Sequence, residues 1–239
     1  MSEIRNALGE TLDFSLHETE SPELILIGHG VTANKDREWA VTLSAELEKA
    51  GVSSLRFSFS GNGSSEGRFE DSTVSKEVED LGAVLDAFRG RRLSYVGHSM
   101  GAAVGVLRAS NDDRIERLVS LGGMVDVQDF AQRKFGEQVP GRDFMWDKPE
   151  CPLSQAYLDD MAAIGSVAEQ AARIRVPWLL VHGTADTVVL PRDSELAKTR
   201  APRAELIALE GADHVFSGEA ATLMARAVSD WFSRSATVA

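Results

Sequence analysis

The chain has 239 residues, of which 37 are acidic and 25 basic, so its formal net charge at pH 7 is −12. A negative surplus of this size argues against nucleic acid or an anionic membrane surface as a partner. The single cysteine, Cys151, excludes an internal disulfide and is typical of a reducing compartment. No apolar run approaches the roughly 18 residues of a membrane span, and residues 1–5 open onto no apolar signal segment. These features predict a soluble, cytoplasmic protein.

Strand-like apolar runs alternate with helical stretches along most of the chain. Residues 4–8 and 11–17 predict an N-terminal hairpin, and six more strands are predicted at 24–27, 55–59, 93–96, 115–121, 178–181 and 204–209. Apolar side chains at helical spacing predict helices over 40–50, 74–88 and 223–232. The alternation predicts an α/β fold with a mostly parallel, eight-stranded sheet covered by helices on both faces.

The alternation stops between Gly123 and Ala172, where aromatic residues and prolines gather. A structureless loop of this length is improbable in a compact domain. Residues 124–171 are therefore predicted to form a small, partly helical cap, inserted into a core of 1–123 and 172–239, with helices within 154–170. Such a cap would cover an apolar pocket, and it offers four candidate substrate contacts: Phe130, Phe144, Trp146 and Tyr157. The alternative is a packed insertion that does not touch substrate.

Gly97, Ser99 and Gly101 form a G-x-S-x-G corner between the strand-like run 93–96 and the small-residue helical run 102–107. Strand, corner and helix in this order predict a nucleophile elbow, which holds the serine hydroxyl clear of the sheet. Glycines are needed two residues before and after the serine because side chains there would collide as strand and helix close up. Ser99 is therefore the predicted nucleophile.

A serine hydroxyl needs a base, and the base needs an orienting acid. On this scaffold the chain order is serine, then acid, then histidine. His214 is the one histidine that lies late in the chain after a candidate acid, Asp186, which follows a strand. We therefore predict the triad Ser99, Asp186 and His214. Asp126, after another strand, is the rival acid, and Asp213 is expected to shape the loop beside the base.

An oxyanion hole needs two backbone amides aimed at the attacked carbonyl oxygen. The amide of Met100, directly after the nucleophile, is one predicted donor. The other is the amide of Val31, in the loop after the strand 24–27. His29 is expected to brace this loop, and it is also kept as a candidate substrate contact.

Two other site types are weighed against this interpretation. Gly28, Gly30 and Ala33 loosely match a dinucleotide fingerprint, but the next strand, 54–59, ends without the acid that would hold a ribose. The glycine-rich segment 61–67 lacks the Lys-Ser/Thr ending of a phosphate loop and is expected to be a turn-rich wall of the site. The histidines show no spacing typical of a metal site. We therefore expect neither a cofactor nor a metal.

Together these residues resemble the α/β-hydrolase superfamily over nearly the whole chain, and within it the bacterial feruloyl (cinnamoyl) esterase group. Residues 29–35 (HGVTANK) resemble that group's oxyanion loop, and 57–71 resemble its loop after the next strand. Residues 182–189 (HGTADTVV) and 211–214 (GADH) resemble its acid and base loops. The resemblance implies an α/β-hydrolase fold and carboxylic ester hydrolysis.

The sequence thus leads to the hypothesis of a cofactor-free serine carboxylesterase for small to medium acyl or aryl esters, acting as a monomer or homodimer. Two alternatives stay open. The scissile bond could be a thioester or a small peptide amide. The chain could also be a non-catalytic, ligand-binding member of the fold, although such a role has no need for an intact serine, acid and histidine.

Overall fold

The computed structural model describes residues 3–201 and 203–235. Its strands are β1 (Phe14–His17), β2 (Glu23–Gly28), β3 (Ser53–Phe57), β4 (Arg92–His98), β5 (Ile115–Leu121), β6 (Trp178–Gly183) and β7 (Ala204–Leu209). Its α-helices are α1 (Glu38–Lys49), α2 (Val74–Ala87), α3 (Met100–Ala109), α4 (Val127–Phe135), α5 (Gln155–Ile164), α6 (Ala168–Ala171), α7 (Pro191–Arg200) and α8 (Glu219–Ser235). Two short 3₁₀ helices are η1 (Phe69–Asp71) and η2 (Met145–Asp147).

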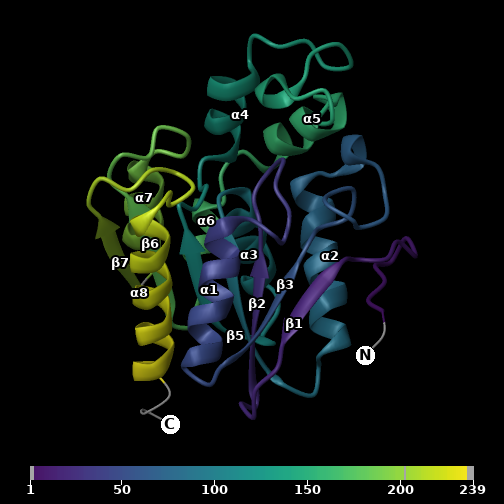
Figure 1. Ribbon diagram of the computed structural model, residues 1–239. Helices are drawn as coiled ribbons and strands as arrows, with labels where there is room; N and C mark the ends of the chain where they lie inside the picture. Colours follow the sequence, from purple (N-terminus) through teal and green to yellow (C-terminus); the bar gives the residue numbers. More distant parts are fainter. Residues whose placement is uncertain (1–2, 202, 236–239) are drawn as a thin grey trace.

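The strands form one sheet in the order β1-β3-β2-β4-β5-β6-β7 (Figure 1). Only β1 runs antiparallel to its neighbour, and the other pairs are parallel. Every residue of β2 and β6 is buried, as expected for parallel strands covered on both sides. The predicted fold class is confirmed, with seven strands in the described part of the chain rather than eight.

The missing strand belongs to the predicted N-terminal hairpin. Residues 4–8 make only one isolated bridge, between Arg5 and Thr11. The side chain of Asn6 accepts hydrogen bonds from the backbone amides of Leu8 and Glu10, both at 3.0 Å. A side chain that closes a turn in this way competes with strand pairing. The prediction of a strand at 4–8 was therefore wrong.

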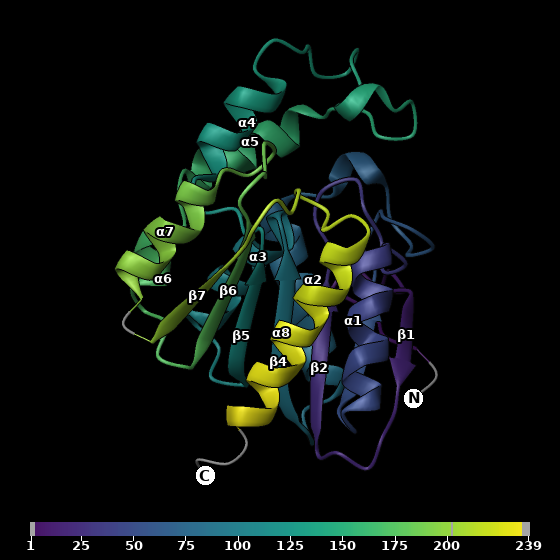
Figure 2. The ribbon, with the colours of Figure 1, turned by 60° about the vertical axis from the view of Figure 1, so that its left-hand side comes forward.

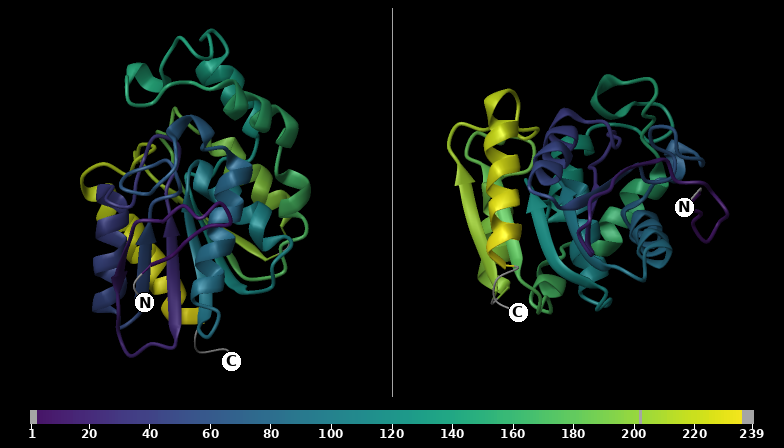
Figure 3. Two further views of the ribbon diagram at one scale, coloured as in Figure 1. Left: turned by 90° about the vertical axis from the view of Figure 1, so that its right-hand side faces the viewer. Right: turned by 60° about the horizontal axis from the view of Figure 1, so that its bottom comes forward.

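Helices cover both faces of the sheet. In Figure 3 (right), α1 and α8 lie on one face, while α2, α3 and α6 lie on the other. Alternate residues of a strand belong to different hydrophobic cores. Ile25 and Ile27 pack with the α1 and α8 side chains, whereas Leu24 and Leu26 pack with those of α2 and α3. This period of two is what a sheet buried on both faces requires.

The chain between β5 and β6 rises above the carboxyl ends of the strands, where α4 and α5 lie across the top of the molecule (Figures 1 and 2). The helices expected within 154–170 are confirmed as α5 and α6, whereas α4 was not predicted. Apolar side chains of this segment, such as Phe130 and Tyr157, belong to the same core cluster as Leu26 of the sheet. The division into a core and a separate cap at 124–171 stays a prediction.

In the described residues no helix has both the length and the apolar character that a bilayer crossing would require.

Candidate active site

Ser99 lies at the sharp corner between β4 and α3. Its backbone has φ 55° and ψ −119°, a conformation that costs free energy for any residue with a side chain. A Cβ on Gly97 would collide with the backbone of Gly101, and one on Gly101 would collide with the carbonyl of His29. Both glycines of the motif are therefore required by close backbone contacts, and the strained corner turns Ser99 toward the end of the sheet.

The structure brings Ser99, His214 and Asp186 into one hydrogen-bonded series. His214 Nε2 lies 3.1 Å from Ser99 Oγ, and His214 Nδ1 lies 2.7 Å from Asp186 Oδ2. An ionised carboxylate only accepts hydrogen bonds, so Nδ1 donates its proton to Asp186. This leaves the lone pair of Nε2 facing the Ser99 hydroxyl.

Several donors surround the Asp186 carboxylate. The amides of Val188 and Val189 donate to Oδ1 at 2.8 and 3.0 Å, and His182 Nε2 lies 3.3 Å from Oδ2. Burial opposes ionisation, but the hydrogen bonds from His182 and His214 outweigh it and hold the pKa of Asp186 well below its usual range. His182 therefore helps to hold the Asp186 carboxylate, a contact that its place at the end of a strand did not reveal.

His98, next to Ser99 in the chain, holds His214 from the other side. Its Nε2 donates to the His214 carbonyl oxygen at 2.8 Å, and its ring packs 4.8 Å from the His214 ring and 4.9 Å from the Trp39 ring. Burial lowers the pKa of His98 to about 3, so the ring is neutral. Within the part of the chain that the structure describes, its Nδ1 is buried without a hydrogen-bond partner. Sequence reasoning gave His98 no role, although its position beside the nucleophile was a usable signal.

The loop after β2 passes directly over Ser99. A Cβ on Gly30 would lie 2.7 Å from the Ser99 Cβ, so only glycine allows this approach. Thr32 has φ 57°, which is rare for a β-branched residue. Behind the loop, His29 Nε2 accepts from the Phe59 amide at 3.1 Å, so its Nδ1 donates to the Gly30 carbonyl at 2.8 Å.

His29 is thus buried behind the loop and does not line the cavity in front of it. Burial lowers its pKa to about 4, which keeps the ring neutral. Met100 follows Ser99 in the chain, and Val31 follows Gly30, which passes directly over Ser99. Among residues 3–201 and 203–235 neither the Val31 amide nor the Met100 amide donates to a protein acceptor. These two donors are free for a ligand.

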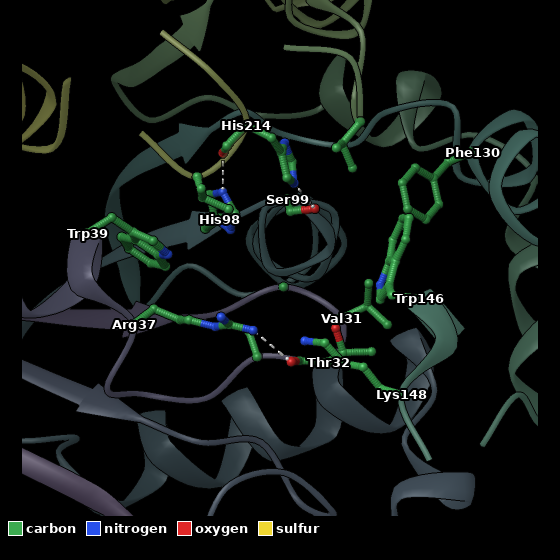
Figure 4. Close-up of a pocket in the computed structure, with 14 residues that line it drawn as sticks. Val31, Thr32, Arg37, Trp39, His98, Ser99, Phe130, Trp146, Lys148 and His214 are labelled. Carbon is green, nitrogen blue, oxygen red and sulfur yellow. Dashed lines mark hydrogen bonds between the residues drawn. The ribbon is translucent and has the colours of Figure 1, made fainter. Parts of the chain in front are cut away.

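A cavity of about 250 Å³ opens in front of Ser99 (Figure 4). Its lining consists of Gly30, Val31, Thr32, Ala33, Arg37, Trp39, His98, Ser99, Phe130, Trp146, Lys148, Val188, His214 and Val215. Two of the predicted substrate contacts, Phe130 and Trp146, are among them. In Figure 4 these two rings stand on one side of Ser99, and Arg37 and Trp39 stand on the other. Sequence reasoning missed Arg37, Trp39 and Lys148, because nothing in the local pattern marks them.

Other candidates lie elsewhere. Tyr157 is a buried residue of α5 whose hydroxyl contacts the Met100 sulfur at 3.6 Å, and Phe144 is 38% exposed outside the cavity. Asp126, the rival acid, caps α4 by accepting from the Asp129 amide at 3.1 Å. Asp213 accepts hydrogen bonds from the amide and hydroxyl of Ser217, as expected for a loop-shaping residue. No group of three or more potential metal-ligating side chains gathers within the described residues.

Comparison with solved structures finds the same fold in known proteins. The structure of Est1E from Butyrivibrio proteoclasticus with ferulic acid bound superposes with a TM-score of 0.85 at 23% identity, covering 98% of each chain. Alpha/beta hydrolase domain-containing protein 10 from mouse gives a TM-score of 0.79 at 20% identity, again covering 98% of each chain. At these identities the likeness concerns the fold.

Curated sequences give weaker but consistent matches. The uncharacterized protein YfhR of Salmonella typhi is 28% identical over 214 residues, which are 82% of this chain and 66% of that protein. Human mitochondrial palmitoyl-protein thioesterase ABHD10 is 30% identical over 118 residues, 49% of this chain and 38% of that protein. The chain thus spans less than two thirds of the length of either relative. The model of the alpha/beta hydrolase family matches residues 24–227, from β2 into α8. The chain therefore belongs to the alpha/beta hydrolase family, as its resemblance predicted.

Proposed function

We propose that this protein is a serine carboxylesterase that hydrolyses small to medium acyl or aryl esters. One observation carries the proposal: the series Asp186, His214 and Ser99 is hydrogen-bonded at 2.7 and 3.1 Å and ends at a cavity. A serine in a strained corner, with a histidine lone pair facing its hydroxyl, is the arrangement that nucleophilic acyl transfer requires.

In the proposed reaction Asp186 stays ionised and holds His214 with its proton on Nδ1. His214 Nε2 removes the Ser99 hydroxyl proton as Oγ attacks the ester carbonyl, and a tetrahedral oxyanion forms. The imidazolium then protonates the leaving alcohol, which gives an acyl-enzyme. Water, deprotonated by the same Nε2, attacks the acyl carbon and releases the acid and free Ser99.

The oxyanion would accept hydrogen bonds from the amides of Val31 and Met100. The absence of protein acceptors for both amides in the described chain supports this role. Met100 also begins α3, whose helix dipole favours negative charge at this end. Removal of one such donor in other enzymes costs about 100- to 1,000-fold in rate.

Cavity size supports a short or medium substrate. At about 250 Å³ the cavity falls below the roughly 300–1,000 Å³ of pockets that enclose drug-sized ligands. The rings of Phe130 and Trp146 provide an apolar wall for an alkyl or aryl group. A long acyl chain would extend beyond this space.

Thioester hydrolysis is the second candidate, favoured by the name of the human relative, a palmitoyl-protein thioesterase. The same residues would act in the same order, with a thiol as leaving group. Matched ester, thioester and amide substrates with one acyl group separate the candidates by their kcat/KM values.

Hydrolysis of p-nitrophenyl esters from acetate to palmitate, together with methyl ferulate, tests the proposal. We expect turnover that is highest for short or medium acyl groups and is lost in Ser99→Ala. Labelling with a fluorophosphonate gives an independent measure of Ser99 reactivity. A Ser99→Ala protein that hydrolyses esters at the wild-type rate would exclude the proposal. A wild-type serine that does not react with the probe would favour a binding role.

A further inference from the structure

The cavity in front of Ser99 carries positive charge. Arg37 and Lys148 both line it, and none of the described aspartates or glutamates does. This is unexpected from composition, because acidic residues outnumber basic ones 37 to 25 and the net charge is −12. The described lining of this cavity, with two cations and no acid, therefore departs from the acidic composition of the chain.

Neither cation has an ionic partner. Within residues 3–201 and 203–235, Arg37 makes one side-chain hydrogen bond, from Nη2 to the Thr32 carbonyl at 2.9 Å, and the Lys148 ammonium makes none. Asp36, the adjacent acid, is held by Lys35 and Arg56, each at 2.8 Å. A guanidinium offers five N–H donors and an ammonium three, so most of their donors remain available.

The two side chains converge. In Figure 4 they approach Thr32 from opposite sides. Both also line a second cavity, which shares Thr32 and Ala33 with the first. Among the described residues, the second cavity is also lined by two acids, Asp36 and Glu150. Glu150 is exposed, and neither acid lines the first cavity. Two cationic side chains that face the same space repel each other, and an anion bound between them would stabilise both.

The backbone that presents Lys148 is strained. Trp146 and Asp147, directly before it, have φ values of 56° and 55°, and Thr32 on the facing loop has φ 57°. Left-handed conformations at non-glycine residues gather where the surrounding structure holds a functional geometry. Burial lowers the pKa values of His29 and His98, and the positive charge of Arg37 lowers both further.

We propose that the substrate, beyond its scissile bond, carries an anionic oxygen group, a carboxylate or a phosphate, which Arg37 and Lys148 bind beside Thr32 while an apolar group packs on Phe130 and Trp146. This inference rests on the proposed function, because it concerns the acyl or alcohol part of an ester that Ser99 attacks. Arg37 and Lys148 are specificity residues and take no part in proton transfer.

Three matched substrate pairs test the inference. Mono-p-nitrophenyl adipate is compared with its methyl ester, which places the charge in the acyl part. 4-Carboxyphenyl butyrate is compared with its methyl ester, and 4-(phosphonooxy)phenyl butyrate with 4-methoxyphenyl butyrate, which place the charge in the alcohol part. The ratio of kcat/KM, charged over neutral, is measured for each pair, with Ser99→Ala as the background.

We expect the charged member of at least one pair to be preferred by about tenfold or more, since charge-assisted hydrogen bonds are among the stronger ones. Arg37→Met and Lys148→Met should each lower that ratio by about tenfold, mainly through KM, and Lys148→Arg should restore it. Added NaCl should lower the wild-type ratio. Lys198→Met, which removes an exposed lysine of α7 outside the cavity, is the control for net charge and should leave the ratio unchanged.

The pair that shows the preference identifies the anion and the side of the ester that carries it. Ratios near one for all three pairs, without a salt effect, would overturn the inference, whatever the variants do. Ser99-dependent turnover of the neutral esters would in that case leave the proposed function standing. If Arg37→Met fails to fold, Lys148→Met and the salt dependence still decide.

Discussion

The two sides of the cavity are built differently. On one side Ser99 and His98 line it, and Asp186 is buried behind His214; backbone geometry and hydrogen bonds hold these residues at or just after the ends of strands. On the other side Trp146, 36% exposed, and Lys148 come from the long segment between β5 and β6. The proposed reacting groups are thus held at the end of the sheet, whereas much of the surface that would select the substrate lies on the segment that carries α4, η2, α5 and α6. Changes on the first side should affect kcat, and changes on the second should affect KM.

After the loss of turnover in Ser99→Ala, the largest effect is expected for Asp186→Asn. The amide oxygen can still accept from Val188 and Val189, so the loop should keep its shape. The amide nitrogen would then donate toward His214 Nδ1 and leave the imidazole proton on Nε2, where it cannot accept the Ser99 proton. We expect kcat on a p-nitrophenyl ester to fall by about 10⁴-fold, without an equal change in KM.

Asp126→Asn is the matched control. Asp126 also follows a strand, but it caps α4, and asparagine is an equally good capping residue. Its kcat should stay within about twofold of wild type. Equal losses in the two variants would mean that the acid has been misassigned.

Gly30→Ala tests how closely the first side is packed. The added methyl group would lie 2.7 Å from the Ser99 Cβ and 3.2 Å from its Oγ, so the loop that carries Val31 must shift. A displacement of about 1 Å in an active site can cost about 100-fold in rate, and we expect a loss of that order in kcat. Gly90→Ala, where a Cβ meets no atom within 4 Å, is the control and should retain full activity. An active Gly30→Ala enzyme would show that this loop is free to move away from Ser99.

The first side of the cavity was largely predictable from the sequence. The corner 97–101 follows an apolar run and precedes a helix of small residues. Close backbone contacts leave room only for glycine at positions 97 and 101. Asp186 and His214 follow strands, and a parallel sheet gathers its carboxyl ends at one edge. Local pattern and chain order were therefore enough to predict the three residues that the structure brings together.

The second side was less predictable, because the positions of its residues depend on how distant loops meet. Phe130 and Trp146 line the cavity, whereas Phe144 and Tyr157 from the same aromatic segment do not. Arg37 precedes α1 like any polar residue at a helix start, and only the fold places it across from Lys148. The wrong strand prediction at 4–8 has a similar cause. The hydrogen bonds of the Asn6 side chain close a turn there, and the hydrophobic pattern does not reveal them.

Acidic pH should lower the free energy of unfolding through two buried histidines near Ser99, His29 and His98. His29 and His98 have folded-state pKa values of about 4 and about 3, below the roughly 6.5 of an unfolded chain. Between these values the unfolded chain binds more protons, so the free energy of unfolding falls as pH falls below about 6.5. Each histidine adds up to about 1.4 kcal/mol per pH unit to this slope. Urea unfolding at several pH values between about 7 and 4 measures it.

His98→Phe isolates the contribution of His98 to the pH dependence of the free energy of unfolding. Phenylalanine keeps a ring beside His214 and Trp39 but cannot be protonated, so the slope below about pH 6.5 should decrease. Glu77, whose pKa burial raises, contributes with the opposite sign in both proteins and cancels from the difference. The lost bond to the His214 carbonyl should lower stability at neutral pH by about 1–3 kcal/mol. An unchanged slope would mean that His98 is protonated in the folded protein.

The smallest effect is expected on the second side. Trp146→Ala removes a ring that lines the cavity and lies 6.5 Å from the Phe130 ring, yet it is already 36% exposed. Loss of about 50 Å² of apolar contact with substrate corresponds to about 1.3 kcal/mol, so KM for longer acyl or aryl esters should rise about tenfold with kcat little changed.

Phe144→Ala is the control, because Phe144 is 38% exposed on the same segment but does not line the cavity. Its acyl-length profile should match that of the wild-type enzyme. If Trp146→Ala instead lowered kcat equally for every ester, this segment would be holding the reacting atoms, and the contrast between the two sides would not hold. A rise in KM confined to the larger esters would assign Trp146 to substrate selection, which is the function that its exposed and strained position allows.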